Sequence, residues 1–380
     1  MAGGDIVFTN ARVVLPGECV TGSVAARGGR IADVAAGPSA VAGVDFGGDL
    51  LIPGLVELHT DHLERELRPR RGVDWPAHSA LSSHDAKLAA CGITTVFDAV
   101  VAGDTFGRPE RAAMLETSVR VIEEAKAGRH LRADHYIHVR CEVGNSDLLP
   151  LFDRFGLGPL VRMVSVMDHT PGARQYADID RFRAYLRTEY KVSEADTETY
   201  IRERQALSEK HAPENRRAVA ARIRARGIKL ATHDDADAAQ IADAVALGAA
   251  VSEFPTTHEA AKAAYVAGLM TVLGAPNIVR GGSHNGNVSA ADLAAEGLLD
   301  ALSSDYMPFS LIEAPFALAR THGIALPDTI ALVTANPARM AGFADRGTIA
   351  AGLRADLVRV RETPNGVIVR GVWREGERIA

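Results

Sequence analysis

From residue 51 onward, short apolar runs alternate with helix-like segments, and this rhythm is the strongest constraint on the fold. Such alternation is typical of βα units that build a parallel sheet. We count eight candidate strands: Leu51–Leu58, Ile93–Ala99, His135–Cys141, Val161–Met167, Ile228–Thr232, Ala250–Phe254, Met270–Gly274 and Ala301–Ser304. Eight units predict an α/β fold of the (β/α)8 TIM barrel type, which we place at residues 51–344.

The two ends of the chain differ from this middle part. Residues 1–50 and 345–380 consist of short apolar stretches separated by turn residues such as Pro16-Gly17 and Gly28-Gly29, a pattern of small strands. We expect both ends to pair in one small β-sandwich domain beside the barrel. Residues 172–226 are highly charged and longer than one crossover needs, so we expect a helical insertion packed outside the barrel.

The composition of the 380-residue chain narrows the class of protein. It is 47% hydrophobic and 24% charged, as in globular chains, and its net charge of -6 indicates no general basic surface for nucleic acid. The three cysteines lie far apart, so we expect neither disulfides nor a cysteine zinc site. The sequence shows no signal-peptide pattern and no apolar run of about 18 residues, so we expect a cytoplasmic protein.

Polar residues stand where the predicted strands end, and in TIM barrels the chemistry takes place at the carboxyl ends of the strands. These strand ends carry three histidines and three carboxylates: His59, Asp61, Glu142, His169, His233 and Asp305. One such residue often caps neighbouring backbone, but several around one barrel predict a metal site. This donor set suits two divalent cations, with zinc or manganese expected.

A site with two metals often needs a bridging anion. A carboxylated lysine is not expected, since residues 127–190 contain no lysine and Lys229 falls at the opposite end of the fifth strand. Glu142 is therefore our candidate bridge. We expect His138 to act outside the metal ligands or on the substrate, with an internal hydrogen bond in the barrel as the alternative.

Two loops on the same face carry residues suited to phosphate. The first has four arginines within seven residues, from Arg65 to Arg71. Guanidinium groups bind phosphate bidentately, so Arg68 and Arg70 are predicted to bind substrate, with a solvated surface loop as the alternative. In the second loop, after the seventh strand, glycines let backbone N–H groups approach an anion. Its candidate substrate-binding residues are Arg280, Gly281, Gly282, Ser283, His284 and Asn285.

Several motifs resemble those of the amidohydrolase superfamily, and the resemblance spans nearly the whole chain. The opening strands, Pro53-Gly54-Leu55 before His59, and Asn336-Pro337-Ala338 near the end are similar to that family. Longer motifs resemble its alkylphosphonate-utilisation branch, which serves the carbon–phosphorus lyase pathway: His59–Glu64, Pro69–Pro76, Arg140–Glu142, Ser252–Thr257 and Arg280–Ser289.

The resemblance implies hydrolysis of the 5-triphosphate of ribose 1-methylphosphonate to the 5-phosphate, with release of pyrophosphate. The implied metal ligands are His59, Asp61, Glu142, His169, His233 and Asp305. Bound metals would lower the pKa of water and neutralise phosphate charge, and Asp305 would orient the water or accept its proton. Two departures stand out: Asp61 replaces the usual second histidine, and the sixth strand, Ser252-Glu253-Phe254, lacks the usual metal-binding histidine.

Two other interpretations stay open. A hydrolase or deaminase acting on a C–N bond of a cyclic amide or sugar amide would use the same metal site, but the arginine-rich loop would then have no evident purpose. A non-enzymatic scaffold would not need a complete ligand set. We therefore expect a small phosphorylated sugar as substrate, no nucleic-acid or membrane partner, and a homo-oligomer, most simply a dimer.

Overall fold

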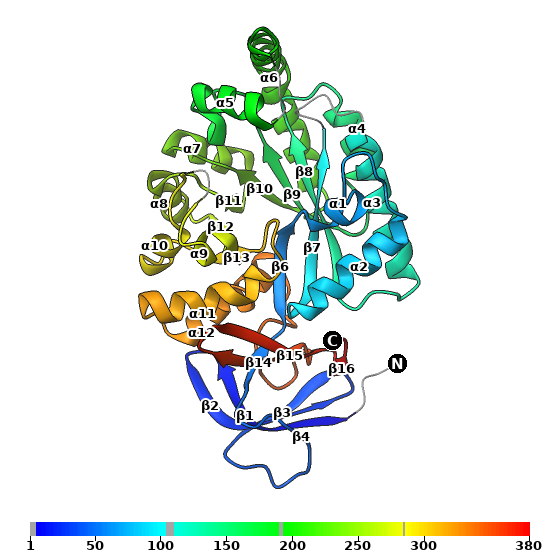
Figure 1. Ribbon diagram of the computed structural model, residues 1–380, viewed down its shortest axis with the longest axis vertical. Coiled ribbons are helices and arrows are strands. Elements are labelled where there is room, and N and C mark those ends of the chain that lie inside the picture. Colours follow the sequence, from blue (N-terminus) through cyan, green and yellow to red (C-terminus); the bar gives the residue numbers. More distant parts are fainter. Residues whose placement is uncertain (1–4, 104–109, 190–192, 284–285) are drawn as a thin grey trace.

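The computed structural model describes residues 5–103, 110–189, 193–283 and 286–380. Within these ranges the strands form two eight-stranded sheets. One is the barrel, in the middle of the molecule, and the other is built from both ends of the chain and lies at one end of the molecule (Figure 1). The predicted fold, a TIM barrel with a β-structured part made from both termini, is confirmed.

The barrel has eight strands, one within or overlapping each predicted range, although the first begins later than predicted. Each pairs in parallel with the next along the chain. They are β6 (Leu55–Thr60), β7 (Ile93–Ala102), β8 (Asp134–Glu142), β9 (Val161–Met167), β10 (Lys229–His233), β11 (Val251–Glu253), β12 (Met270–Gly274) and β13 (Ala301–Ser303). Apolar runs form such strands because both faces of a barrel strand are covered. Side chains such as Val56, Phe97 and Val272 form one buried cluster.

The barrel closes between its first and last strands, β6 and β13. A parallel bridge joins Thr60 and Asp305, and the buried carboxylate of Glu57 completes the seam. This carboxylate accepts hydrogen bonds from the backbone N–H groups of His59 and Ser304, each at 2.7 Å. Burial raises the pKa of Glu57 to about 7. The seam therefore holds the carboxyl ends of β6 and β13 side by side.

Helices cover the outside of the barrel (Figure 1). In the described part of the chain they are α1 (His62–Leu67), α2 (Ala77–Ala90), α3 (Glu110–Ala127), α4 (Leu148–Phe155), α5 (Ile179–Glu189), α6 (Glu194–Arg224), α7 (Ala238–Leu247), α8 (His258–Val266), α9 (Ala275–Val279), α10 (Ala290–Ala295), α11 (Ser310–His322), α12 (Leu326–Ala331) and α13 (Ala335–Met340). None of these described helices has both the length and the apolar character that crossing a membrane requires.

The charged region expected to form a helical insertion contains α5 and α6. Helix α6 is 31 residues long and lies at the end of the molecule opposite to the terminal sheet (Figure 1). The side chain of Ser193 caps its first turn. Farther along, Asn215 donates to the backbone carbonyl of Val143, and Arg216 pairs with Asp168, each at 2.8 Å. Helix α6 is thereby bonded to the loops that follow β8 and β9.

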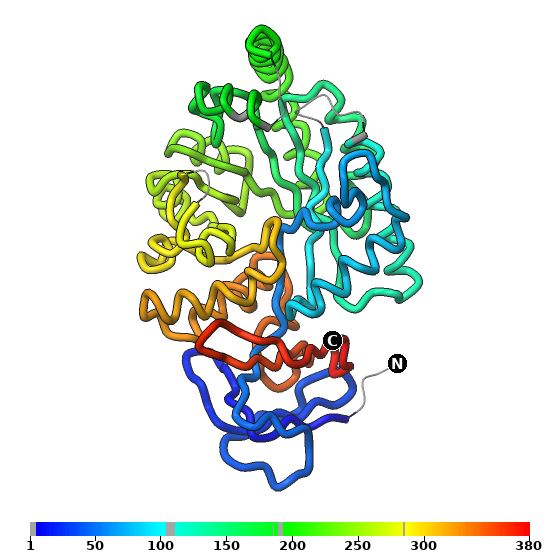
Figure 2. The backbone as a smooth tube through the Cα atoms, viewed as in Figure 1, coloured from blue at the N-terminus to red at the C-terminus, as the bar shows by residue number. Residues whose placement is uncertain are grey.

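The terminal sheet joins the two ends of the chain. Its strands are β1 (Ile6–Leu15), β2 (Glu18–Arg27), β3 (Arg30–Ala36), β4 (Val44–Asp45), β5 (Leu50–Pro53), β14 (Leu357–Thr363), β15 (Gly366–Arg374) and β16 (Glu377–Arg378). Strands β14 and β5 pair antiparallel, so that segments from opposite ends of the sequence lie side by side (Figure 2). The rings of Phe8 and Trp373 pack edge to face in the core of this sheet, with centroids 4.8 Å apart.

The prediction of one strand at Leu51–Leu58 is wrong, because the chain passes from one sheet to the other within it. Strand β5 ends at Pro53 in the terminal sheet, and β6 begins at Leu55 in the barrel. Between them, Gly54 packs so closely that an added Cβ atom would lie 2.3 Å from the Thr94 hydroxyl oxygen. The domain division at residues 50 and 345 stays a proposal, and β5 extends beyond its first boundary.

A buried network of polar side chains ties α2 to the outside of the barrel. The carboxylate of Asp98 contacts Nε2 of His84 and Nδ1 of His135, each at 2.7 Å. The other ring nitrogen of His135 lies 3.2 Å from Asp85. Burial lowers the pKa of His135, but Asp98 and Asp85 more than offset this effect and raise the pKa to about 9. His135 is therefore a buried cation between two carboxylates at neutral pH.

We expect this cation to make stability depend on pH. Because the pKa of His135 is raised from 6.5 to about 9, its stabilising contribution is fully present below pH 6.5 and is lost as the pH rises through about 9. The contribution is on the order of 3 kcal/mol. Urea unfolding of the parent and of His135→Gln should give a smaller difference in the free energy of unfolding at pH 9.5 than at pH 6.5. The same difference at both pH values would contradict a protonated His135 in the folded protein.

Candidate metal centre

The six predicted metal ligands all lie at the carboxyl ends of barrel strands. His59 lies in β6 and Asp61 follows it, Glu142 and His233 end β8 and β10, and His169 and Asp305 follow β9 and β13. The ring of His233 lies 5.7 Å from the ring of His59 and 5.7 Å from that of His169, measured between centroids. The fold therefore brings side chains from distant parts of the sequence to one end of the barrel.

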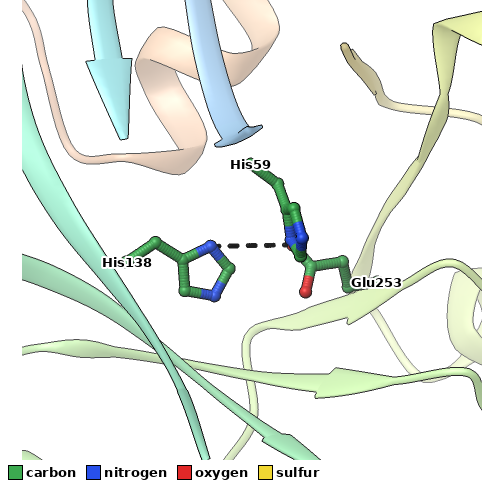
Figure 3. Close-up of side chains that lie close together, drawn as sticks. All are labelled: His59, His138 and Glu253. Carbon is green, nitrogen blue, oxygen red and sulfur yellow. Dashed lines mark hydrogen bonds and ion pairs between the residues drawn. The ribbon is translucent and has the colours of Figure 1, made fainter. Parts of the chain in front are cut away.

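One cluster consists of His59, His138 and Glu253, buried side chains from three strands that face one another (Figure 3). Nδ1 of His59 is hydrogen-bonded to Oε1 of Glu253 at 2.8 Å, and Nδ1 of His138 to the carbonyl of Leu58 at 3.0 Å. In both rings Nε2 has no hydrogen-bond partner in the described part of the chain. A ring held at Nδ1 in this way presents Nε2 to a metal.

A second cluster consists of His169, His233 and Asp234. Oδ2 of Asp234 lies 2.9 Å from Nδ1 of His233 and 3.7 Å from Nε2 of His169. The shorter contact is not a hydrogen bond, since neither of its two atoms has a hydrogen-bond partner among the described residues. Ligands that share a metal at about 2.0–2.2 Å lie about 3–4 Å apart. The spacing therefore fits a cation held between these side chains.

Glu142 fixes the ring of His169. Its carboxylate accepts a hydrogen bond from the backbone N–H of His169 at 2.9 Å and contacts Nδ1 of the ring at 2.7 Å. Burial lowers the pKa of His169, but Glu142 and Asp234 offset this effect and raise the pKa to about 9. A metal ion at the second cluster would have to displace the proton from the other ring nitrogen of His169. The role expected for Glu142 as a bridge between two metals stays a proposal.

Asp61 and Asp305 add two further carboxylates to the centre. Burial raises the pKa of Asp305 to about 7, and the charge of Asp61 contributes to this rise. Asp305 has a φ angle of 53°, a backbone region that Asp and Asn adopt more readily than most residues. Oδ1 of Asp61 is buried and has no hydrogen-bond partner in the residues described. A nearby cation would stabilise both carboxylates in their charged forms.

Unpaired polar atoms distinguish this centre from the network around Asp98. Seven buried atoms that have no partner among the described residues gather here: His59 Nε2, Asp61 Oδ1, His138 Nε2, His233 Nδ1, His233 Nε2, Asp234 Oδ2 and Glu253 Oε2. In the network, both ring nitrogens of His84 and of His135 have partners. Buried polar atoms are costly without a partner. Metal ions therefore fit the barrel centre, whereas the outer network is complete without one.

Glu253 and Asp234 belong to the centre although the sequence did not single them out as ligands. Glu253 is the last residue of β11, and Asp234 directly follows β10. Both obey the pattern of carboxylates at strand ends that identified Asp305. Because a histidine is the usual metal ligand in the sixth strand, Glu253 was not predicted as a ligand. His138 was expected to act outside the metal ligands or on the substrate, or else to make an internal hydrogen bond. Its Nδ1 makes such a bond, and its Nε2 has no partner among the residues that the structure describes.

The predicted loop after β12 reaches the centre in part. A cavity of about 240 Å³ lies over the centre, and Ser283 is among the residues that line it. Arg280, Gly281 and Gly282 do not line it. His284 and Asn285 lie outside the described residues. Asn277, in α9, and Asn287 also line the cavity, and neither is one of the six residues named as candidates for substrate binding in this segment.

In the arginine-rich segment after β6, the guanidinium of Arg65 lies 5.7 Å from the ring centroid of Tyr306, which lines this cavity, but Arg68 and Arg70 do not reach it. Arg68 pairs with Asp74 at 2.9 Å and lines a separate hollow next to α3. Arg70 is exposed. Neither arginine lines the cavity over the metal centre. They would reach a bound substrate only where it extends beyond the cavity.

We expect that Glu253→Gln binds less metal than the parent. Glutamine can still accept the hydrogen bond from His59, so the fold should persist, but the negative charge next to two free histidine nitrogens is lost. Elemental analysis after dialysis should show about one divalent ion fewer per chain, because a buried metal site needs its charged ligands. Glu296→Gln, which alters an exposed pair with His258, serves as the control. Equal metal contents in all three proteins would exclude Glu253 as a ligand.

Comparison with known proteins identifies relatives along the whole chain. The model of the amidohydrolase family matches residues 159–379. The chain is 45% identical over 377 residues to the alpha-D-ribose 1-methylphosphonate 5-triphosphate diphosphatase of Escherichia coli (strain K12), covering 98% of this chain and 100% of that protein. It is also 27% identical over 342 residues to the imidazolonepropionase of Deinococcus radiodurans, covering 85% of this chain and 80% of that protein.

Solved structures with low sequence identity share the fold. The N-acetyl-D-glucosamine-6-phosphate deacetylase of Mycobacterium smegmatis superposes with a TM-score of 0.65 at 17% identity, over 100% of both chains. The corresponding deacetylase of Thermotoga maritima gives a TM-score of 0.62 at 15% identity, over 99% of both chains. At these identities the likeness concerns the architecture, a barrel together with a sheet built from both ends of the chain.

Proposed function

Because the chain belongs to the amidohydrolase family and is a hydrolase, we propose that it hydrolyses alpha-D-ribose 1-methylphosphonate 5-triphosphate to the 5-phosphate and releases pyrophosphate. The observation that carries this proposal is the 45% identity over essentially the full length of the Escherichia coli diphosphatase. The dense set of carboxylates and histidines under one cavity supports it, since phosphoryl transfer asks mainly for positioning and charge neutralisation.

We propose that the centre holds two divalent ions. His59, His138 and Glu253 would hold one, and His169, His233 and Asp234 the other, with Asp61, Asp305 and a bridging Glu142 beside them. The many carboxylates make this a hard donor set, which suits manganese as well as zinc. When bound, the ions supply Lewis acidity and lower the pKa of water near the scissile bond.

The chain's own residues would orient the reactants. Asp305, held at the seam by the bridge to Thr60, would accept the proton of the attacking water. Ser283 lies on the cavity wall and would donate a hydrogen bond to the triphosphate. We retain Arg280 and the glycines beside it as residues that would contact the part of the triphosphate outside the cavity. Arg68 and Arg70 would contact parts of the substrate that extend still farther from the centre.

The same centre could in principle serve hydrolysis of a C–N bond. The imidazolonepropionase of Deinococcus radiodurans is a more distant relative, at 27% identity, and its name denotes a different reaction. The much higher identity to the diphosphatase favours phosphate chemistry. In the cell we propose a role in phosphonate utilisation through the carbon–phosphorus lyase pathway, in the cytoplasm and as a dimer.

We expect the bond broken to be the one next to the sugar-proximal phosphorus. Water attack on that phosphorus makes pyrophosphate the leaving group, so reaction in ¹⁸O-water should place the label in the sugar 5-phosphate. Mass spectrometry of both products decides this. Label in the pyrophosphate would move the attack to the next phosphorus, and release of orthophosphate alone would contradict the proposed reaction. Turnover of a cyclic amide in place of the triphosphate would favour the C–N alternative.

We expect Asp305→Asn to lose activity while keeping its fold. Asparagine has the same shape and tolerates the positive φ angle of this residue, but it lacks the basic oxygen. Loss of a general base typically costs about 10²–10⁴-fold in turnover, and the melting temperature should change little. Asp292→Asn, an exposed residue in the first turn of α10, is the matched control. Activity of Asp305→Asn equal to that of this control would exclude the proposed role.

A further inference from the structure

We propose that Arg140 is a catalytic residue whose guanidinium binds the phosphate oxygens of the substrate at the metal centre, an inference that rests on the proposed function. Arg140 lies in β8 between His138 and Glu142, two residues from each. Side chains two apart on a strand share a face. Arg140 is therefore on the face of β8 that carries two residues of the centre.

The position of Arg140 on the cavity wall differs from that of every arginine predicted from the sequence. Among the described residues that line the cavity over the centre, Arg140 is the one with a permanent positive charge. Arg68, Arg70 and Arg280 do not line this cavity. Arg174, which comes close to the end of β10, is engaged by the carboxylate of Asp235. A phosphate that enters the cavity therefore meets Arg140 first among these cations.

Arg140 is held in place without a carboxylate partner. Its Nε atom donates to Sδ of Met167 at 3.3 Å, and no carboxylate lies within ion-pair distance in the described part of the chain. A thioether is a weak acceptor, so it orients the side chain and leaves the two terminal nitrogens for a stronger acceptor. Two parallel N–H groups match two oxygens of one phosphate. When an anion binds, the N–H groups of such a partly buried arginine gain hydrogen-bond acceptors.

The charge of Arg140 acts on both sides of the centre. After burial, it is the largest cause that lowers the pKa of His59, and it opposes the rise in the pKa of Asp305 that burial and Asp61 produce. Asp234 and Glu253 also face Asp305. The guanidinium therefore lies near the residues that would hold a metal and near the residue proposed to take up the proton. Charge that develops on a phosphate between them would be stabilised directly.

Three variants test this inference in the metal-loaded protein: Arg140→Ala, Arg140→Lys and, as control, Arg162→Ala. Arg162 lies at the opposite end of the neighbouring strand β9 and is exposed. We expect kcat/KM of Arg140→Ala to fall about 10²–10³-fold, as for loss of one preorganised donor, with its metal content unchanged. Lysine keeps the positive charge but lacks the two parallel N–H groups of the guanidinium, so kcat/KM of Arg140→Lys should lie between those of the parent and Arg140→Ala. The control should resemble the parent.

Two further measurements separate binding of phosphate from a structural role. Inorganic pyrophosphate, titrated into each metal-loaded protein, should bind at least about tenfold more weakly to Arg140→Ala than to the parent. Guanidinium chloride at concentrations below those that unfold the protein should restore part of the activity of Arg140→Ala and have no such effect on the control. Rescue by the free cation would show that the missing group acts directly on the reactants.

Three results would overturn the inference. The first is parental kinetics and pyrophosphate affinity in Arg140→Ala. The second is loss of metal from this variant with full recovery when metal is added back, which would make Arg140 a residue that balances the carboxylates of the centre. The third combines two observations: the parent releases no pyrophosphate from the triphosphate, and Arg140→Ala binds pyrophosphate as tightly as the parent does. If that parent binds pyrophosphate more tightly than the variant, the proposed reaction fails while Arg140 remains a phosphate ligand.

Discussion

The seam between β6 and β13 is the constraint on which the site depends. A parallel sheet of eight strands closes only if its first and last strands meet, and here the meeting is made by one buried carboxylate, that of Glu57, and a short bridge. The same contacts place His59 beside Asp305, so closing the barrel and assembling the acidic side of the metal centre are one event. Burial raises the pKa of Glu57 to about 7, so a charged carboxylate at the seam carries a desolvation cost.

Much of this architecture could be predicted because the alternation of apolar runs with helix-like segments can be recognised from residues that are neighbours in sequence. Each barrel strand is a short run of buried residues, and the strand-end position of His59, Glu142 and His233 follows from where those runs stop. The crossing at Gly54 could not be predicted in this way. Leu51 and Leu58 look alike in sequence, and only the close packing of Gly54 against Thr94 separates the strands to which they belong.

The candidate site shows a similar limit. Strand-end carboxylates are visible in the sequence, but whether their atoms are paired is a property of three-dimensional neighbours. Among the described residues, two clusters combine histidines with an aspartate, and the residue types alone do not distinguish them. His135 has a partner for each ring nitrogen, whereas His233 has none for either in the described structure. The number of arginines in a loop shows the same limit, since Arg140 lines the cavity over the centre whereas Arg68 and Arg70 do not.

Closure at the seam also has a consequence for the order in which the protein is made. The hydroxyl of Ser303 donates to the carbonyl of His59 across 244 residues of sequence. At about 5–20 residues per second, a ribosome needs roughly 10–50 s to travel between these two positions. During that interval β6 is a finished strand with one open edge, which is a template for wrong pairing. The two sides of the candidate metal centre can meet only after the chain has been made as far as Asp305, because the seam joins Thr60 to Asp305.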